Sequence, residues 1–149
     1  MRRLWAVFGA ASILIAACTS APTVTQPNPS TAACLDAAKV RGLYDEWAHE
    51  SVDANLSDGV DMAQVVASLR AAREIALELA LATAVDPVAA GHFEDAADAY
   101  LEVPPIPPHA SLDAMSESDI HRLERAKGEA SDGIYAGIEA LNNSAIPFC

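Results

Sequence analysis

From about Ala32 to the end of the chain, apolar residues recur at the three- and four-residue spacing of an α-helix. Alanine is abundant there, β-branched residues are scattered, and the alternation that marks a half-buried strand does not persist. Turn-forming and proline-rich stretches divide this pattern into four segments. The spacing therefore restricts the region to an all-α fold of four helices.

The first helix is predicted over residues 32–51 and the second over residues 61–84, with a polar turn between them. The apolar stripe of the first helix consists of Ala37, Val40, Leu43, Tyr44 and Trp47, extended one turn back by Cys34. The stripe of the second consists of Met62, Val65, Val66, Leu69, Ala72, Ala76, Leu79 and Ala80, widened by Ile75, Leu77 and Leu81. A stripe this broad predicts that the second helix is the most central of the four.

The third helix is predicted to start at Asp86-Pro87, because aspartate caps a helix and proline is tolerated in its first turn. It runs to about Glu102, and its inward residues are Ala89, Phe93, Ala96, Ala97 and Tyr100. The prolines of residues 104–108 then predict an extended, stiff connector.

The fourth helix is predicted to begin at Ser116, with Asp119 in a capping-box-like position. Its apolar stripe consists of Ile120, Leu123, Ala130, Ile134, Ile138 and Leu141. Gly133 and Gly137 lie one turn apart and allow a neighbouring helix to approach closely. Four helices with mostly short connections predict a small antiparallel bundle, up-down-up-down, on a disordered N-terminal tether.

The beginning of the chain has the features of a processing segment rather than of a folded element. Arg2 and Arg3 are basic, residues 4–17 are apolar or small, and Ile15-Ala16-Ala17 leads directly into Cys18. The apolar run is shorter than the roughly 20 residues that a membrane-spanning helix needs. In these first eighteen residues the chain resembles bacterial prolipoproteins, whose lipobox cysteine is acylated.

This resemblance implies a lipoprotein signal peptide over residues 1–17 and lipidation, for example with palmitate, at Cys18. The alternative is an ordinary secretory signal or a short uncleaved anchor. Residues 19–31 contain three prolines and no apolar face, which predicts that residues 18–31 form a lipidated, flexible tether. The helical domain then comprises residues 32–149. We expect it at the extracytoplasmic face of the cell membrane, held through lipid on Cys18.

Assigning Cys18 to lipid leaves Cys34 and Cys149 as a pair in an oxidising compartment. A disulfide between them would close a loop of about 115 residues and stabilise the fold by roughly 4–5 kcal/mol. An up-down-up-down bundle brings the end of its fourth helix beside the start of its first, which favours the same pairing. The alternative is two free thiols.

The formal net charge of the chain is −12, and loss of Arg2 and Arg3 with the signal peptide would make it −14. This charge argues against nucleic acid as a partner, because phosphates would be repelled. Cationic proteins, cationic peptides and divalent metal ions remain possible partners, and solubility alone is the simpler explanation of the charge.

Residues 53–64 resemble an EF-hand loop in that they carry oxygen donors between two predicted helices. The turn glycine comes one place late, at Gly59, and Gln64 replaces the bidentate glutamate, so a capped turn is the better interpretation. Glu46 and His49 have the Glu-x-x-His spacing that supplies half of a di-metal carboxylate site. No second Glu-x-x-His motif occurs in the sequence.

No serine lies in a nucleophile-elbow sequence, and His92 with Asp95 lacks a nucleophile beside it. We therefore expect no enzyme, no catalytic residue, no cofactor and no metal. Tyr44 and Trp47 are the candidates for lining a ligand pocket, although aromatic residues at helical spacing usually belong to the core.

The leading hypothesis from sequence is a non-enzymatic, lipid-anchored envelope lipoprotein that binds a cationic protein or ligand. An alternative is an exclusion or inhibitor lipoprotein of the kind that phages and mobile elements encode. A metal-binding or enzymatic domain is the third.

Overall fold

The computed structural model describes residues 33–56, 60–107 and 110–149. Four α-helices account for most of this region: α1 (Ala37–Asp53), α2 (Met62–Ala82), α3 (Pro87–Ala99) and α4 (Glu117–Asn142). Two 3-10 turns, η2 (Tyr100–Glu102) and η3 (Leu112–Ala114), lie between α3 and α4. Within the described ranges the only β contact is an isolated bridge between Leu35 and Phe148. The all-α prediction is confirmed.

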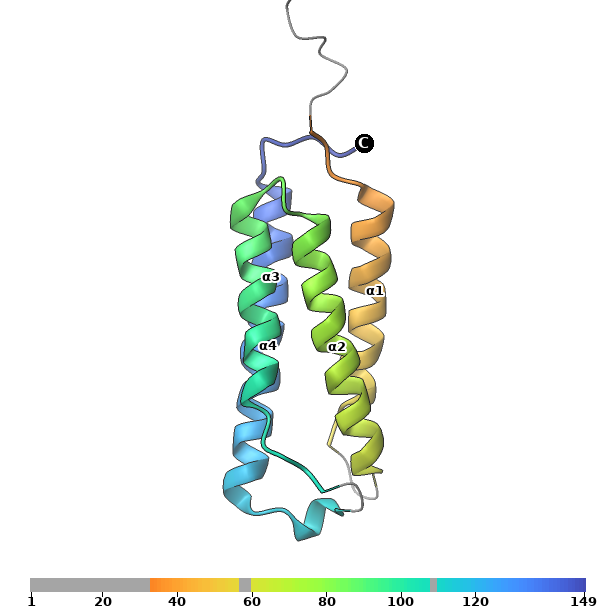
Figure 1. The fold of residues 1–149 in the computed structure, drawn as a ribbon, viewed down its shortest axis with the longest axis vertical. Helices are drawn as coiled ribbons and strands as arrows, with labels where there is room; N and C mark the ends of the chain where they lie inside the picture. Colours follow the sequence, from red (N-terminus) through yellow and green to blue (C-terminus); the bar gives the residue numbers. More distant parts are fainter. Residues whose placement is uncertain (1–32, 57–59, 108–109) are drawn as a thin grey trace, which may run out of the picture. The chain divides into compact units, whose positions relative to one another are not determined.

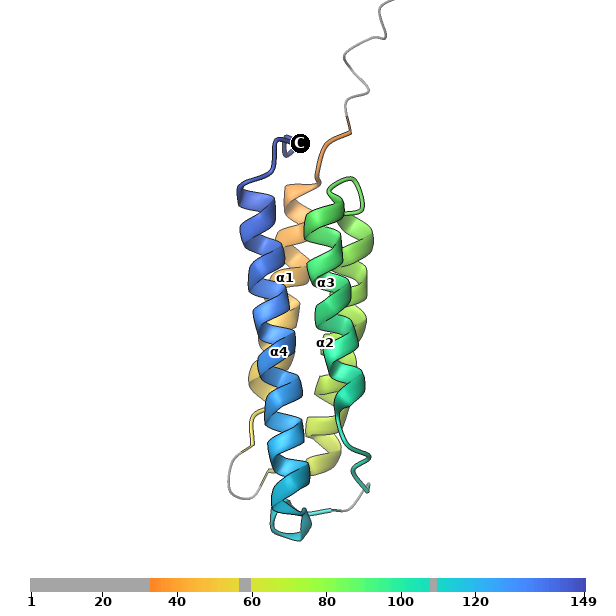
Figure 2. The same cartoon turned by 90° about the vertical axis from the view of Figure 1, so that its left-hand side faces the viewer.

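The helices form an up-down-up-down bundle, with α1 and α3 running one way and α2 and α4 the other (Figures 1 and 2). Helices adjacent in sequence pack closely along their lengths, α1 on α2, α2 on α3 and α3 on α4. The backbones of α1 and α4, the first and last helices, approach each other less closely. The bundle is therefore tightest through α3 and most open between α1 and α4.

Each α-helix begins at a side-chain cap, which satisfies backbone N–H groups that have no partner inside the helix. The capping residues are Asp36, Asp61, Asp86 and Ser116. Asp86 Oδ1 accepts from the backbone N–H groups of both Val88 and Ala89, at 3.1 Å each. The predicted starts of the third and fourth helices, at Asp86-Pro87 and Ser116, are confirmed.

One hydrophobic core runs the length of the bundle, and its largest fully buried side chains include Phe93, Leu35, Met62 and Leu79. The predicted inward residues of the third helix are all buried. Gly137 lies directly against the ring of Phe93, because a Cβ built on Gly137 would stand 2.5 Å from the ring atom Cε1. The predicted close approach at this glycine pair therefore occurs between α4 and α3.

The predicted start of the first helix is wrong by five residues, because α1 begins at Ala37 rather than at residue 32. Asp36 caps it, and the preceding residue Leu35 is extended, with its N–H donating to the carbonyl oxygen of Pro147 at 2.9 Å. Cys34 therefore does not extend the helical stripe, and Ala37 is exposed.

The stripe of the second helix is narrower than predicted, since Leu81 is 76% exposed. This helix packs against α1 and α3 and is not more central than its neighbours.

The described helices include none that is both long and apolar enough to cross a membrane. The predicted signal peptide, the lipidation at Cys18 and the tether of residues 18–31 lie outside the described residues.

Candidate binding groove between the first and last helices

A groove with a volume of about 1000 Å³ lies between the N-terminal half of α1 and the C-terminal end of α4. Its apolar walls include Val40 and Tyr44 of α1, Ile138 and Leu141 of α4, and Phe148 of the C-terminal tail. Arg41, Asp45 and Asn142 add polar groups to its lining. An apolar groove with few polar groups is typical of a site for a small amphipathic ligand or a helical segment.

Three aromatic side chains lie where α1 and α4 face each other. The rings of Tyr44 and Trp47 are 5.9 Å apart between centroids, and Trp47 meets Tyr135 of α4 edge-on at 6.0 Å. Rings of this size fill the space between two helices whose backbones lie further apart than those of their neighbours. Tyr135 nonetheless keeps more than half of its surface exposed.

The two predicted pocket residues have different positions. Tyr44 lines the groove and is partly buried. Burial raises the pKa of the Tyr44 hydroxyl, and the nearby Tyr135 and Asp45 raise it further. Trp47 is only 2% exposed and belongs to the core, where its Nε1–H donates to the hydroxyl of Tyr100 at 3.0 Å. Tyr44 is therefore a candidate for ligand contact. Trp47 instead anchors α1, the helix that carries Tyr44, to the core.

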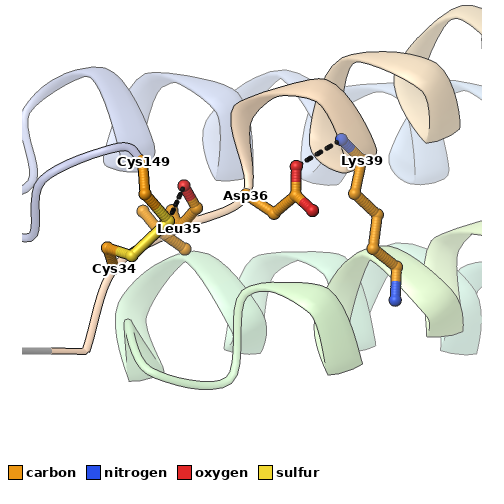
Figure 3. The surroundings of a disulfide bond; sticks show 5 residues. All are labelled: Cys34, Leu35, Asp36, Lys39 and Cys149. Atoms are coloured by element: carbon orange, nitrogen blue, oxygen red, sulfur yellow. Dashed lines mark hydrogen bonds between the residues drawn. A yellow bond between two sulfur atoms is a disulfide. The ribbon is translucent and has the colours of Figure 1, made fainter. Parts of the chain in front are cut away.

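The C-terminal tail, which contributes Phe148 to the lining of the groove, is bonded to the start of the folded region (Figure 3). Cys34 and Cys149 form a disulfide with a Cα–Cα distance of 5.7 Å. On either side of Phe148, the N–H of Leu35 donates to Pro147 O and the N–H of Cys149 donates to Leu35 O, each at 2.9 Å. The side chain of Phe148 is thereby held beside the groove, although Phe148 follows the last helix.

The same tail is connected to the turn between α2 and α3. The pKa of the Asp86 carboxyl group is lowered. Its side-chain interaction with Ser144 contributes most to this shift, and the hydrogen bond from the Ala89 N–H contributes next. Ser144 Oγ also accepts from the N–H of Ile146 at 3.1 Å. Ser144 therefore connects the cap of α3 to the segment that carries Phe148.

Sequence reasoning missed Tyr135 and Phe148. Tyr135 follows Ile134 of the predicted stripe, and a helical projection would have placed it at the edge facing a neighbour. Phe148 lies outside every helix, so no periodicity marks it. Its position could have been inferred from the predicted Cys34–Cys149 pairing, because residue 148 must then accompany residue 149.

The loop compared with an EF-hand is described only in part, because residues 57–59 lie outside the described ranges. In the described part, Asn55 Oδ1 accepts from Lys127 Nζ at 3.2 Å, and Asp61 Oδ1 accepts from the N–H of Ala63 at 2.9 Å. These oxygens serve an interhelical contact and a helix cap. Lys127 also donates to the carbonyl oxygen of Ala54 at 2.6 Å, and burial lowers its pKa.

Glu46 and His49 lie on α1, and His92 and Asp95 lie on α3. Across the residues that the structure describes, no three His, Cys, Asp or Glu side chains are grouped so as to hold a metal ion.

Comparison of the chain with family models, curated proteins and solved structures finds no significant match. Its function has to be argued from the residues and their geometry.

Proposed function

We propose that this chain is a non-enzymatic lipoprotein, anchored through lipid on Cys18 at the extracytoplasmic face of the cell membrane, that binds a cationic amphipathic segment of a partner protein. The α1–α4 groove is the observation that carries the binding role. Its volume of about 1000 Å³ is about twice that of two other cavities among the described residues, at about 510 and 520 Å³.

The groove and its surroundings fit a partner that is apolar on one side and basic on the other. Its walls offer aliphatic and aromatic surface, and its lining contains one exposed anion, Asp45, and one exposed cation, Arg41. Beyond Lys127, α4 carries the exposed carboxylates Glu129, Asp132 and Glu139 and no Lys or Arg. Helices that dock into grooves place apolar residues inward, while charges at the rim select the partner.

The anchor is supported by the lipobox-like sequence that ends at Cys18. Metabolic labelling with an alkyne analogue of palmitate tests it in the bacterial host. The natural chain should incorporate label and float with membranes, and the Cys18→Ser variant should lose the label. The Cys149→Ser variant is the matched control, because it removes a cysteine that no lipid is expected to occupy. Equal labelling of the Cys18→Ser variant would contradict the anchor.

The binding role is tested on the chain from Thr19 onward, which contains every element of the bundle. The probe is a synthetic amphipathic helix of leucine and lysine, and its control has glutamate in place of lysine. Fluorescence anisotropy should show saturable binding of the lysine peptide alone. Asp45→Lys and Phe148→Ala should each weaken it about tenfold, because they change the rim charge and an apolar wall.

Leu101→Ala removes an exposed apolar side chain that does not line the groove, and it should leave the affinity unchanged. If both peptides bound equally, or if Leu101→Ala weakened binding as much as Phe148→Ala, the groove would not be the site.

A further inference from the structure

One end of the bundle carries a group of exposed apolar side chains that the core does not use. We call it the end patch and define it as Leu81, Val85, Val88 and Phe148, of which Phe148 also lines the groove. Leu81 is 76% and Val88 63% exposed. Among the described residues, the other large hydrophobic side chains with comparable exposure are Val52, Leu101 and Tyr135. Single exposed apolar residues are common on soluble proteins, but several at one end indicate a contact surface.

The fold places these four residues at the same end. α2 ends at Ala82 and α3 begins at Pro87, so Leu81, Val85 and Val88 surround the turn between these helices. Figures 1 and 2 show that this turn, the start of α1 and the C-terminal tail share one end of the bundle. Ser144 of the tail also lowers the pKa of Asp86 in this turn.

The chain that leads to Cys18 leaves the bundle at this end. Cys34 precedes α1 and is bonded to Cys149, so the covalent path toward Cys18 starts beside the end patch. Between Cys18 and Cys34 lie fifteen residues, which span at most about 50 Å when fully extended. A lipid on Cys18 would therefore keep the end patch at high local concentration near the bilayer surface.

The exposed charges near this end are mixed, whereas the chain as a whole is strongly acidic. Lys39 and Arg41 are exposed in the first turns of α1, together with the exposed carboxylate of Asp36. The carboxylate of Asp86 is buried in its capping role. Without Arg2 and Arg3 of the signal peptide the formal charge is −14, so anionic headgroups repel the chain as a whole and the contact depends on apolar insertion.

We propose that the end patch is a membrane-docking surface whose occupant is the phospholipid bilayer in which the Cys18 lipid is embedded. This inference rests on the lipid anchor proposed above. The bundle then stands with the turn between α2 and α3 in the headgroup region, and η2 and η3 lie at the end away from the lipid. The Cys18 lipid supplies the attachment, and partial insertion of the end patch would fix the orientation of the bundle at the bilayer surface.

Two tryptophan variants of the lipidated chain test this orientation. Val88→Trp and Leu101→Trp are matched, because Val88 lies in the first turn of α3, Leu101 lies just beyond its last residue, and the two are 63% and 61% exposed. Loss of the signal peptide removes Trp5, so the buried Trp47 is a common background in both proteins. Each protein is reconstituted into phosphatidylcholine vesicles with brominated acyl chains, which quench tryptophan fluorescence on contact.

The added tryptophan of Val88→Trp should be quenched about threefold more than that of Leu101→Trp, with emission shifted to shorter wavelength. Adding Leu81→Gln and Val85→Thr to Val88→Trp should remove most of the difference. Equal quenching at the two positions, or none at either in protein that floats with the vesicles, would overturn the docking surface. Protein that does not float at all would instead contradict the lipid anchor, and the docking proposal would fall with it.

Discussion

The indole Nε1–H of Trp47 donates a hydrogen bond of 3.0 Å to the hydroxyl of Tyr100 inside the bundle. Trp47 lies on α1 and Tyr100 in η2, so this bond joins the helix that forms the groove to the end of the third helix. Burial raises the pKa of the Tyr100 hydroxyl, and the bond from Trp47 partly opposes that effect. A polar bond in this position fixes one arrangement of α1 against the rest of the core.

We expect Tyr100→Phe to lower the free energy of unfolding by about 1–3 kcal/mol, because it leaves the buried indole N–H without a partner. Trp47→Phe should cost at least as much, since it also removes buried surface. The double variant should cost less than the sum of the two single variants. Denaturant unfolding followed by circular dichroism measures all three, and strict additivity would show that the two side chains act independently.

Two glycines of α4 should respond oppositely to the same substitution. Gly137→Ala places a methyl group against the fully buried ring of Phe93 and should lower the free energy of unfolding by about 1–3 kcal/mol. Gly128 has open space where a Cβ would stand, so Gly128→Ala should raise it by up to about 1 kcal/mol. Thermal unfolding of the pair provides the test. Stabilisation by both substitutions would mean that α3 and α4 are not in close contact at Gly137.

Local sequence signals predicted the parts of the fold that depend on neighbouring residues. The caps at Asp86 and Ser116 follow from short-range hydrogen bonding, and the buried positions around Phe93 follow from helical period. Leu35 shows where this reasoning stops. The predicted first helix includes it, but its backbone pairs with Pro147, a residue more than one hundred positions away. No local pattern reports such a pairing.

The candidate site was harder to predict than the fold for the same reason. Tyr44 and Trp47 are both aromatic residues at helical spacing, but only Tyr44 lines the groove, whereas Trp47 belongs to the core. Which of the two faces the groove depends on the separation of α1 from α4, and that separation depends on tertiary contacts. Phe148 joins the site only through the pairing of the C-terminal tail with the start of the folded region.

The disulfide should contribute strongly to stability because it closes a loop of 115 residues. In the chain-entropy model the Cys34→Ser/Cys149→Ser variant should lose about 4–5 kcal/mol of unfolding free energy. All four helices and their core contacts remain, so its helical circular dichroism at 25 °C should change little. The Cys18→Ser variant is the control and should keep both the fold and the disulfide. An equal loss of stability in Cys18→Ser would contradict the separation of anchor and domain.

The cap of α3 should make the bundle sensitive to acid. Asp86 has its pKa lowered below the ordinary value of 3.8, chiefly by Ser144. A lowered pKa in the folded state means that the ionised carboxylate stabilises the fold above pH 3.8, and that this contribution is lost as pH falls through the folded-state pKa.

Asp86→Asn keeps a good helix cap but cannot ionise. The difference in unfolding free energy between the natural chain and Asp86→Asn should therefore be constant above about pH 5 and shrink toward pH 2. Ser144→Ala should raise the pKa of Asp86 toward its ordinary value, as read by carbon-13 NMR of the carboxyl group. It should also narrow the pH range over which the unfolding free energy falls with acid. If the stability of Asp86→Asn fell with acid as steeply as that of the natural chain, other carboxylates would account for the sensitivity. The bond from Ser144 would then be only a structural contact between the C-terminal tail and the start of α3.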